Sequence, residues 1–568
     1  MNQLQPIYTE ANECQDCYKC IRECPVKAIK IENSRAAIVD SGCIYCGHCV
    51  AVCPVGAKRV RQDLPRAQQL VQLKKTYVSI APSFHSEFPT ISEGQLIAAL
   101  TALGFTGVSE TALGADIVSQ YTAATLPTLL PGVYISSACP VVVTLMKKHY
   151  PQIQERVMSV MSPLMAHAKY LRKQYGADIG VVFIGPCIAK KKEADLYPDL
   201  IDIVITFDDL RAWFASAGID LNTVDASGVF VPVRATLGRL YPIDGGMIAS
   251  IKKSCATTDQ QFMSFSGMAT IQETLRDLEF IDVGTTKMFI ELLSCAGGCI
   301  HGPATCNPGS TIAKRLEIIR TAPQNAHPLC LPNLSREWVV SEVPKPHYTP
   351  QQIADVLRSV GKQTLEDELN CSGCGYDSCR QFATALLTGH AERQMCVTYM
   401  RKLAQNKANA LLKTMPAGAV IVNESLEVME CNRAFAELLG EDILDIFMVR
   451  PGLPGAKLKA LVPFLDIFKQ VLESGEAQVT RDIRYKDMIM EVTVFTIEKN
   501  RVVGAICTDI TTPSVQRERI VKQTSAALKK NIAAVQKIAY ILGENAADIE
   551  IILNSIVQSL GSKVKDAK

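Results

Sequence analysis

Short apolar runs alternate with amphipathic stretches through the middle of the chain, from Thr76 to about Pro350. Each run is only a few residues long and almost wholly apolar, which is typical of strands buried within a sheet. Each is followed by a stretch with the apolar spacing of a helix. This rhythm predicts α/β layers, in which sites form at the carboxyl ends of strands. The predicted strands are Tyr77–Ile80, Gly132–Ile135, Gly180–Ile184 and Asp202–Thr206.

A second pattern begins after a connecting helix predicted at Tyr399–Thr414. Two short apolar segments are followed by a helical segment and then by three longer segments that would complete a sheet, so a smaller α+β domain is expected. The predicted strands are Gly418–Val422, Leu426–Glu430, Ala477–Tyr485, Met488–Ile497 and Arg501–Asp509.

From Pro513 onward the pattern is helical. One apolar stripe repeats at four- and three-residue spacing, as in a coiled coil, and Gly543 separates it from a second stripe. Such stripes serve either ordinary helix packing or contact with a second chain. The first stripe is Leu528, Ile532, Val535, Ala539 and Leu542, and the second is Ile549, Ile552, Leu553, Ile556 and Leu560.

Length and charge narrow the class of protein. A chain of 568 residues is longer than a single hydrophobic core supports, so several domains are expected. A net charge of +2 gives no indication of nucleic-acid binding. The first 30 residues carry acids and four cysteines instead of an apolar leader, and the longest apolar runs, such as Val181–Ile184, are too short for a bilayer. We therefore expect a soluble, cytoplasmic protein without membrane contact.

The chain has 21 cysteines. Because the sequence shows no export signal, we expect them to bind metal and not to form disulfides. Sixteen fall into ligand-like sets. The remaining five are expected to be small buried apolar residues: Cys255, Cys306, Cys330, Cys431 and Cys507.

Eight of these cysteines form a doubled C-x2-C-x2-C-x3-C-P motif at the start of the chain. Three thiolates of each run converge on one [4Fe–4S] cubane, while the fourth, before proline, ligates the other cubane. A pair of zinc sites would instead show two pairs of ligands. The predicted clusters are therefore held by Cys14, Cys17, Cys20 and Cys53, and by Cys24, Cys43, Cys46 and Cys49, with a polar connector at residues 63–75.

Another cysteine motif follows the central region. Cys371, Cys374 and Cys379 lie in a glycine-containing segment, a helix is predicted at Asp377–Ala391, and Cys396 follows it. The motif resembles a small [4Fe–4S] domain of anaerobic redox proteins. Zinc is the alternative, since four thiolates also suit it.

Four central cysteines lie where predicted strands end. Cys139 follows one strand, Cys187 another, and Cys295 and Cys299 lie in a glycine-containing loop. From spacing alone they could either share one more cubane or be structural.

These three segments resemble the signature loops of the [FeFe]-hydrogenase large subunit. The resemblance implies that Cys139, Cys187, Cys295 and Cys299 bind the H-cluster cubane, with Cys299 bridging to a two-iron unit that carries CO, cyanide and a dithiolate. It also implies catalytic-site roles for Lys190, which would hydrogen-bond a cyanide, for Glu193, and for Ser162 in a serine–proline loop. A solvated surface lysine is the alternative for Lys190.

The chain departs from that family where protons move. Ala138 replaces the proton-relay cysteine, and no carboxylate occurs between Ile117 and Gln154. Leu293 replaces a methionine. His301 could serve as a relay or be a polar loop residue. Because a general acid–base relay contributes about 10²–10⁴ in rate, its loss predicts slow turnover.

The C-terminal α+β region resembles a PAS domain, through its two opening strands, the Asn432-Arg433-Ala434-Phe435 segment and the Asp509-Ile510-Thr511 exit. A bare dimerisation module is the alternative. The predicted domains are a 2[4Fe–4S] ferredoxin domain (1–61), a hydrogenase domain (76–350), a 4Fe–4S domain (351–402), a PAS domain (403–512) and a helical segment (513–568).

Together these resemblances predict an H2-sensing [FeFe]-hydrogenase of low turnover that relays its redox state to a signalling domain. The alternatives are a working ferredoxin-linked hydrogenase, or an iron–sulfur electron-transfer scaffold without the two-iron unit. The implied partners are H2 and protons, a redox protein such as ferredoxin, hydrogenase maturation proteins, a separate kinase or phosphatase, and a second copy in a homodimer.

Overall fold

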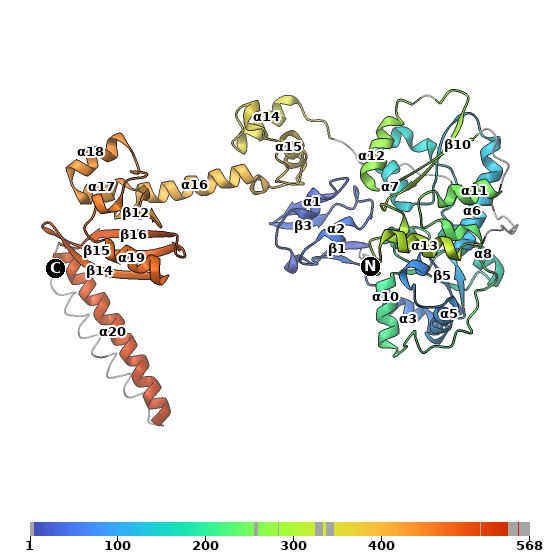
Figure 1. Ribbon diagram of the computed structural model, residues 1–568, viewed down its shortest axis with the longest axis horizontal. Coiled ribbons are helices and arrows are strands. Elements are labelled where there is room, and N and C mark those ends of the chain that lie inside the picture. The colour runs from blue at the N-terminus through green and yellow to red at the C-terminus, as the bar shows by residue number, and fades with distance from the viewer. Residues whose placement is uncertain are drawn as a thin grey trace. The chain divides into compact units, whose positions relative to one another are not determined.

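A computed structural model describes residues 5–254, 260–281, 283–323, 333–336, 343, 346–511, 513–542 and 555 (Figure 1). The chain divides into two compact units, residues 1–400 and 401–568. Each unit has its own apolar cores, and each is described separately below.

The first unit begins with a small, internally repeated domain. Strand β1 (Ile7–Thr9) pairs antiparallel with β4 (Lys58–Val60), and β2 (Ile29–Glu32) pairs with β3 (Arg35–Ile38). Helices α1 (Lys19–Arg22) and α2 (His48–Val52) carry cysteines and pack on each other. The doubled cysteine motif therefore folds as a doubled structural unit.

Residues 63–75, predicted as a polar connector, instead form a helix, α3 (Leu64–Leu73). The helix was not predicted, although Leu64, Ala67 and Leu70 recur at three-residue spacing. This places them on one face, where Ala67 is fully buried and the two leucines pack against the central core.

The central domain contains two parallel sheets, ordered β6-β5-β8-β9 and β10-β11-β7. The four predicted strands occur within one residue of their predicted limits, each followed by a helix. The strands are β5 (Thr76–Ile80), β6 (Gly107–Glu110), β7 (Gly132–Ile135), β8 (Gly180–Ile184), β9 (Ile203–Ile205), β10 (Gln260–Ser266) and β11 (Lys287–Leu293).

Helices cover both sheets and complete their cores. α6 and α8 pack closely on each other, and α6 also contacts α11. The helices are α4 (Phe84–Glu87), α5 (Glu93–Ala102), α6 (Thr111–Thr125), α7 (Pro140–His149), α8 (Pro163–Tyr175), α9 (Ala189–Leu196), α10 (Phe207–Ser216), α11 (Gly246–Ser254), α12 (Met268–Asp277) and α13 (Thr311–Thr321).

The first unit ends in a small helical module. α14 (Pro350–Ser359) packs on α15 (Cys379–Leu387), which is shorter than predicted because Gly389, at φ +70°, lies just beyond its end. Helix α16 (Val397–Thr414) begins directly after Cys396 and leads into the second unit.

The second unit is an antiparallel sheet of order β13-β12-β16-β15-β14, with helices between β13 and β14 in sequence. The helix α20 follows the sheet, as the helical pattern after Pro513 predicted, while the second apolar stripe lies outside the described residues. The elements are β12 (Gly418–Asn423), β13 (Val428–Cys431), α17 (Arg433–Leu439), α18 (Glu441–Val449), α19 (Leu465–Ser474), β14 (Gln478–Tyr485), β15 (Met488–Glu498), β16 (Val502–Asp509) and α20 (Pro513–Leu542).

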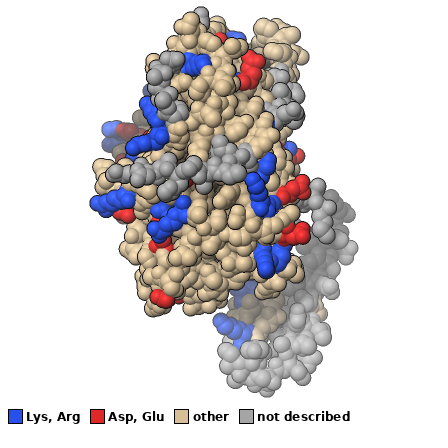
Figure 2. Space-filling view, turned by 90° about the vertical axis from the view of Figure 1, so that its right-hand side faces the viewer, with Lys and Arg blue, Asp and Glu red and all other residues tan. Residues whose placement is uncertain are grey.

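Over the described ranges, no helix is both long and apolar enough to cross a bilayer. On the face in Figure 2, basic and acidic side chains are scattered over a mostly uncharged surface.

Candidate functional site

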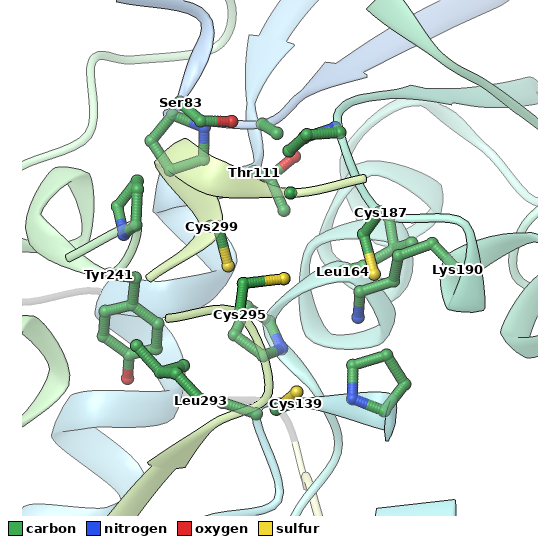
Figure 3. A pocket seen from close by; sticks show the side chains of 18 of the residues that line it. Ser83, Thr111, Cys139, Leu164, Cys187, Lys190, Tyr241, Leu293, Cys295 and Cys299 are labelled. Carbon is green, nitrogen blue, oxygen red and sulfur yellow. The ribbon is translucent and has the colours of Figure 1, made fainter. Parts of the chain in front are cut away.

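The four central cysteines line one cavity of about 110 Å³ between the two sheets (Figure 3). Cys139 follows β7, Cys187 follows β8, and Cys295 and Cys299 follow β11, so the carboxyl ends of parallel strands place all of them. The loop carrying the last two is tight: Gly298 has φ +100°, and a Cβ there would lie 2.1 Å from the carbonyl oxygen of Pro242. The structure thus brings together the residues that the sequence singled out.

These thiols are buried against one another. Burial, with the neighbouring charge of Cys139, raises the pKa of Cys187 to about 11, and burial raises the pKa of Cys295 and Cys299 further. Deprotonating such a group of thiols is unfavourable unless a cation compensates, which is what bound iron does.

Lys190 reaches the same cavity from α9 and is held by two partners. Its Nζ donates to Glu193 Oε2 at 2.6 Å and to Ser162 Oγ at 3.2 Å, and all three side chains are buried. Ser162 caps α8 and also accepts from the backbone N–H of Met165. Lys190 is therefore a fixed cation at the cavity wall, and not the solvated lysine of the alternative interpretation.

The cavity wall is otherwise mostly apolar. Ala138 and Leu293 line it, at the positions where relay and packing residues differ from the resembled family. Among the described lining residues there is no aspartate, glutamate or histidine. The groups on the described wall that can exchange protons are therefore thiols, hydroxyls and Lys190.

Four hydroxyl-bearing residues on the cavity wall were missed from the sequence: Ser83, Thr111, Tyr241 and Ser294. Ser83, just after β5, is buried, and its Oγ has no hydrogen-bond partner within the described structure. Tyr241 is also buried, and its hydroxyl shares a 2.8 Å hydrogen bond with Ser119 Oγ. The sequence marks Ser83 only by its position just after a strand, and it marks Tyr241 only as a tyrosine in a loop.

His301 does not line the cluster cavity. It lies on a second cavity, of about 510 Å³, together with Cys295 and with Cys46 of the ferredoxin-like domain. Burial and the charge of Lys314 lower the pKa of His301.

The ferredoxin-like domain groups its thiols as the motif predicts. The pKa of Cys20 is raised to about 11, mainly by burial, with the charges of Cys14, Cys17 and Cys53 adding to it. Cys43, Cys46 and Cys49 each neighbour Cys24 in the same way, forming the second set. The second set faces the hydrogenase-like cavity, because Cys46 is close enough to Cys295 to influence its pKa.

The third cysteine set lies in the helical module, with Cys379 and Cys396 buried and Cys371 exposed. In the described parts of the chain, no three Cys, His, Asp or Glu side chains converge closely enough for a single metal ion.

The cavity fits the group that the sequence predicts for it. Four thiols open on one space, a buried ammonium faces it, and the hydroxyl of Ser83 lies there unpartnered. Cys139, Cys187, Cys295 and Cys299 would hold the cubane, and Cys299 would hold the two-iron unit.

The five cysteines outside these sets have different outcomes. Cys431 and Cys507 are buried in the core of the second unit, as predicted. Cys306 was predicted to be buried but is exposed, because its loop runs over the surface and its Sγ contacts Asp208. Cys255 and Cys330 lie outside the described residues.

Three family models match the chain. The model for the iron-only hydrogenase large subunit, C-terminal domain, matches residues 74–303. The 4Fe-4S dicluster model matches residues 6–54, and a model for an Fe-S cluster segment matches residues 367–398.

Similar proteins agree with these matches. The NADP-reducing hydrogenase subunit HndD of Solidesulfovibrio fructosivorans is 24% identical over 47% of this chain and 56% of its own length. Iron hydrogenase 1 of Clostridium pasteurianum is 24% identical over 44% of this chain and 53% of its own length. The chain thus spans about half the length of these curated relatives. A solved structure of the [FeFe]-hydrogenase HydA1 from Chlamydomonas reinhardtii covers 45% of this chain and 88% of its own, at 20% identity and TM-score 0.37.

Proposed function

The chain belongs to the [FeFe]-hydrogenase family, and from this premise we propose that it senses H2. In this proposal H2 binds and is oxidised slowly at an H-cluster, and iron–sulfur clusters relay the redox state to a PAS domain. Two features outside the hydrogenase-like cavity motivate the sensing role: a third cluster motif, and an α+β domain that follows it.

Ala138 is the observation that carries the proposal. It lies on the cavity wall beside Cys139, where a methyl group can neither take up nor release a proton. The described wall also offers no carboxylate or imidazole in its place. Since a missing acid–base group lowers the reaction rate by about 10²–10⁴, the site is better suited to reporting bound H2 than to turning it over rapidly.

The chain's own residues position and shield the bound group. When bound, the two-iron unit would supply the H2-splitting chemistry. Lys190, fixed by Glu193 and Ser162, presents a cation to the anionic ligands of that unit, and a charge-assisted hydrogen bond there would fix its orientation. The apolar wall excludes water, which strengthens this interaction.

The second unit supports the PAS part of the proposal. Its five-stranded antiparallel sheet has helices inserted after the second strand. Asn432 joins the first strand to the first helix, accepting from the N–H groups of Ala419 and Phe435 and donating to the carbonyl of Ala417 at 2.8 Å. Asp509 and Thr511 close the exit turn by hydrogen bonds to each other and to Ile489. The output would then be read by a separate kinase or phosphatase.

Infrared spectroscopy and gas exchange on the matured full chain test the proposal. We expect CO and cyanide bands that shift under H2, with low H2 turnover. Ala138→Cys restores a titratable thiol next to Cys139 and is expected to raise turnover by about tenfold or more. The conservative Ala138→Ser, which has no group titrating near neutral pH, is the matched control and should stay near the wild-type rate.

Two results would contradict the proposal in different ways. High turnover of the unaltered chain would show a working hydrogenase with water or His301 as its relay. Lack of CO and cyanide bands after maturation would leave an iron–sulfur electron-transfer scaffold.

A further inference from the structure

The ferredoxin-like domain contacts the rest of the first unit through two separate surfaces. The first surface surrounds its second cysteine set. Lys148 of α7 donates to the carbonyls of Asp40 and Cys43, at 2.8 and 2.9 Å, and His149 hydrogen-bonds the carbonyl of Gly42. This surface therefore docks the loop before Cys46 on the hydrogenase-like domain.

The second surface is built around α1 and contacts the helical module that holds the third cysteine set. Gly375, next to Cys374, has φ +93°, and a Cβ there would lie 2.7 Å from Ile21 Cγ2 and 3.3 Å from the backbone nitrogen of Arg22. The two backbones can approach this closely only because residue 375 has no side chain.

Polar contacts secure the same surface. Lys27 Nζ donates to the carbonyl of Gly375 at 2.9 Å and lies 3.4 Å from Asp377 Oδ1. The N–H of Ile31, in β2, donates to the carbonyl of His390 at 3.1 Å. These contacts join residues more than 340 positions apart in sequence.

An apolar cluster is shared across this surface and includes thiols from both sides. It is continuous from the ferredoxin-like domain to the helical module, so the cysteine sets are separated by packed side chains and not by solvent. Its buried members are Cys20, Ile21, Ile29, Ile31, Ala36, Val360, Tyr376, Phe382, Ala385, Ala391, Met395 and Cys396, with Cys14, Cys24, Cys49 and Cys374 packed at its edge.

Tyr376 lies between the two cysteine sets. It is 5% exposed, and its hydroxyl is buried without a hydrogen-bond partner in the described structure. Its ring belongs to the shared apolar cluster, so packed side chains are continuous between the two cysteine sets.

We propose that the contact between Gly375 and Ile21 makes the ferredoxin-like domain an electron junction, through which the cluster at Cys371, Cys374, Cys379 and Cys396 exchanges electrons with the cluster ligated by Cys24. One electron leaves the reduced cluster of the ferredoxin-like domain and reduces the third cluster, and no bond forms or breaks. The inference rests on the proposed function only for the source of these electrons, which is H2.

The route has a consequence for the partners of this chain. The helical module covers the α1 side of the ferredoxin-like domain, and the hydrogenase-like domain covers the other cluster loop. Electrons from the hydrogenase-like site therefore pass to the segment that precedes α16 in preference to an external carrier docking at α1.

Electron paramagnetic resonance of the full chain tests the junction. The chain is reconstituted with iron and sulfide alone and reduced with dithionite, a low-potential one-electron donor, so that neither H2 nor a two-iron unit is involved. A Cys374→Ser chain identifies the signal of the third cluster by difference. We expect the wild-type spectrum to show spin–spin splitting between the third cluster and the ferredoxin-like clusters.

Gly375→Ala is expected to lose most of that splitting with unchanged iron content and total spin, because the added methyl group overlaps Ile21. Gly389→Ala is the matched control: Gly389 also has positive φ, at +70°, in the same module, but a Cβ there would meet nothing within 4 Å. It should keep the wild-type splitting.

A wild-type spectrum equal to the sum of independent clusters would overturn the junction, as would full splitting in Gly375→Ala. If Gly375→Ala loses iron, Lys27→Met is measured instead, because it removes only the polar contacts at this surface. Loss of the splitting would then support the junction, and full splitting would overturn it. Failure here leaves H2 sensing untouched, and missing CO and cyanide bands leave the junction untouched.

Discussion

Three consecutive lysines on α9 have three different environments. Lys190 faces the cluster cavity, Lys192 is partly exposed, and Lys191 is fully buried. Lys191 Nζ lies 3.0 Å from Asp63 Oδ2 and donates to the carbonyl of Val204 at 2.9 Å. Asp63 also contacts Arg61, so one buried ion network joins the end of the ferredoxin-like domain to α9.

Lys191→Met is expected to lower the free energy of unfolding of the first unit by about 1–3 kcal/mol, because buried Asp63 would lose one charged partner while Arg61 stays. Chemical denaturation of the full chain, followed by the first transition, measures this. Lys192→Met, one residue away, is the control and should change stability by less than about 1 kcal/mol. Equal effects of the two substitutions would contradict the role assigned to the buried pair.

At this scale the sequence predicted which central cysteines come together, but it did not predict the polar residues around them. Cysteine motifs with fixed spacing can be recognised in the sequence, and the structure places Cys139, Cys187, Cys295 and Cys299 on one cavity. Ser83 and the partner of Lys191 could not be found, because a serine after a strand is common and Asp63 lies 128 residues before Lys191. Pairings over such distances depend on the fold and leave no local pattern.

At the scale of elements, His167 fastens α8 to two strands of the first parallel sheet. Its Nδ1 lies 2.7 Å from Ser79 Oγ in β5, and its Nε2 lies 2.9 Å from Ser109 Oγ in β6. Burial lowers the pKa of His167 to about 3, so the folded protein holds the ring neutral. Gly114 of α6 permits this packing, since a Cβ there would lie 2.7 Å from the Cβ of His167.

The sign of the pH dependence follows from that depressed pKa. Above pH 6.5, the ordinary pKa, the ring is neutral in both folded and unfolded chains. As the pH falls below this value, only the unfolded chain takes up the proton, so stability is lost toward pH 3 at about 1.4 kcal/mol per pH unit. Unfolding free energies of the first unit between pH 7 and pH 5.5 measure this slope.

His167→Gln is expected to flatten that slope while also lowering stability at pH 7, because the amide cannot titrate. His85, whose pKa burial also lowers to about 3, contributes the same way in both chains and cancels from the difference. Exposed His347 supplies the control, and His347→Gln should leave the slope unchanged. A wild-type slope in His167→Gln would rule out this assignment.

Strands made almost wholly of apolar residues were predicted well, and the short helix α3, with few apolar positions, was missed. The buried strands β5, β7 and β8 were predicted closely because nearly every residue in them is apolar or small. The helix at residues 64–73 was not predicted, because Arg66 and three glutamines make the segment polar overall, although Leu64, Ala67 and Leu70 mark its buried face. The sequence also gave no indication that the strands form two sheets, since sheet membership depends on contacts between distant segments.

At the scale of the whole molecule, α16 is the connection between cluster chemistry and the second unit. It starts at Val397, directly after Cys396, the proposed ligand of the third cluster, and β12 begins four residues after its end at Thr414. None of its residues is buried, so side-chain packing does not hold it straight. Its backbone hydrogen bonds are therefore the continuous structure along which a change at Cys396 can be transmitted.

Ala408→Pro interrupts those hydrogen bonds in the middle of α16, at an exposed position where proline costs about 3 kcal/mol of helix stability. Under the sensing proposal, replacing N2 with H2 changes amide hydrogen exchange within residues 418–509 of the wild-type chain. Ala408→Pro should abolish this change while the cluster spectra remain as in wild type. Ala408→Gln keeps the helix and should keep the change. If the proline variant still responds to H2, the signal does not travel along α16, and if wild type never responds, the second unit is not reading the clusters.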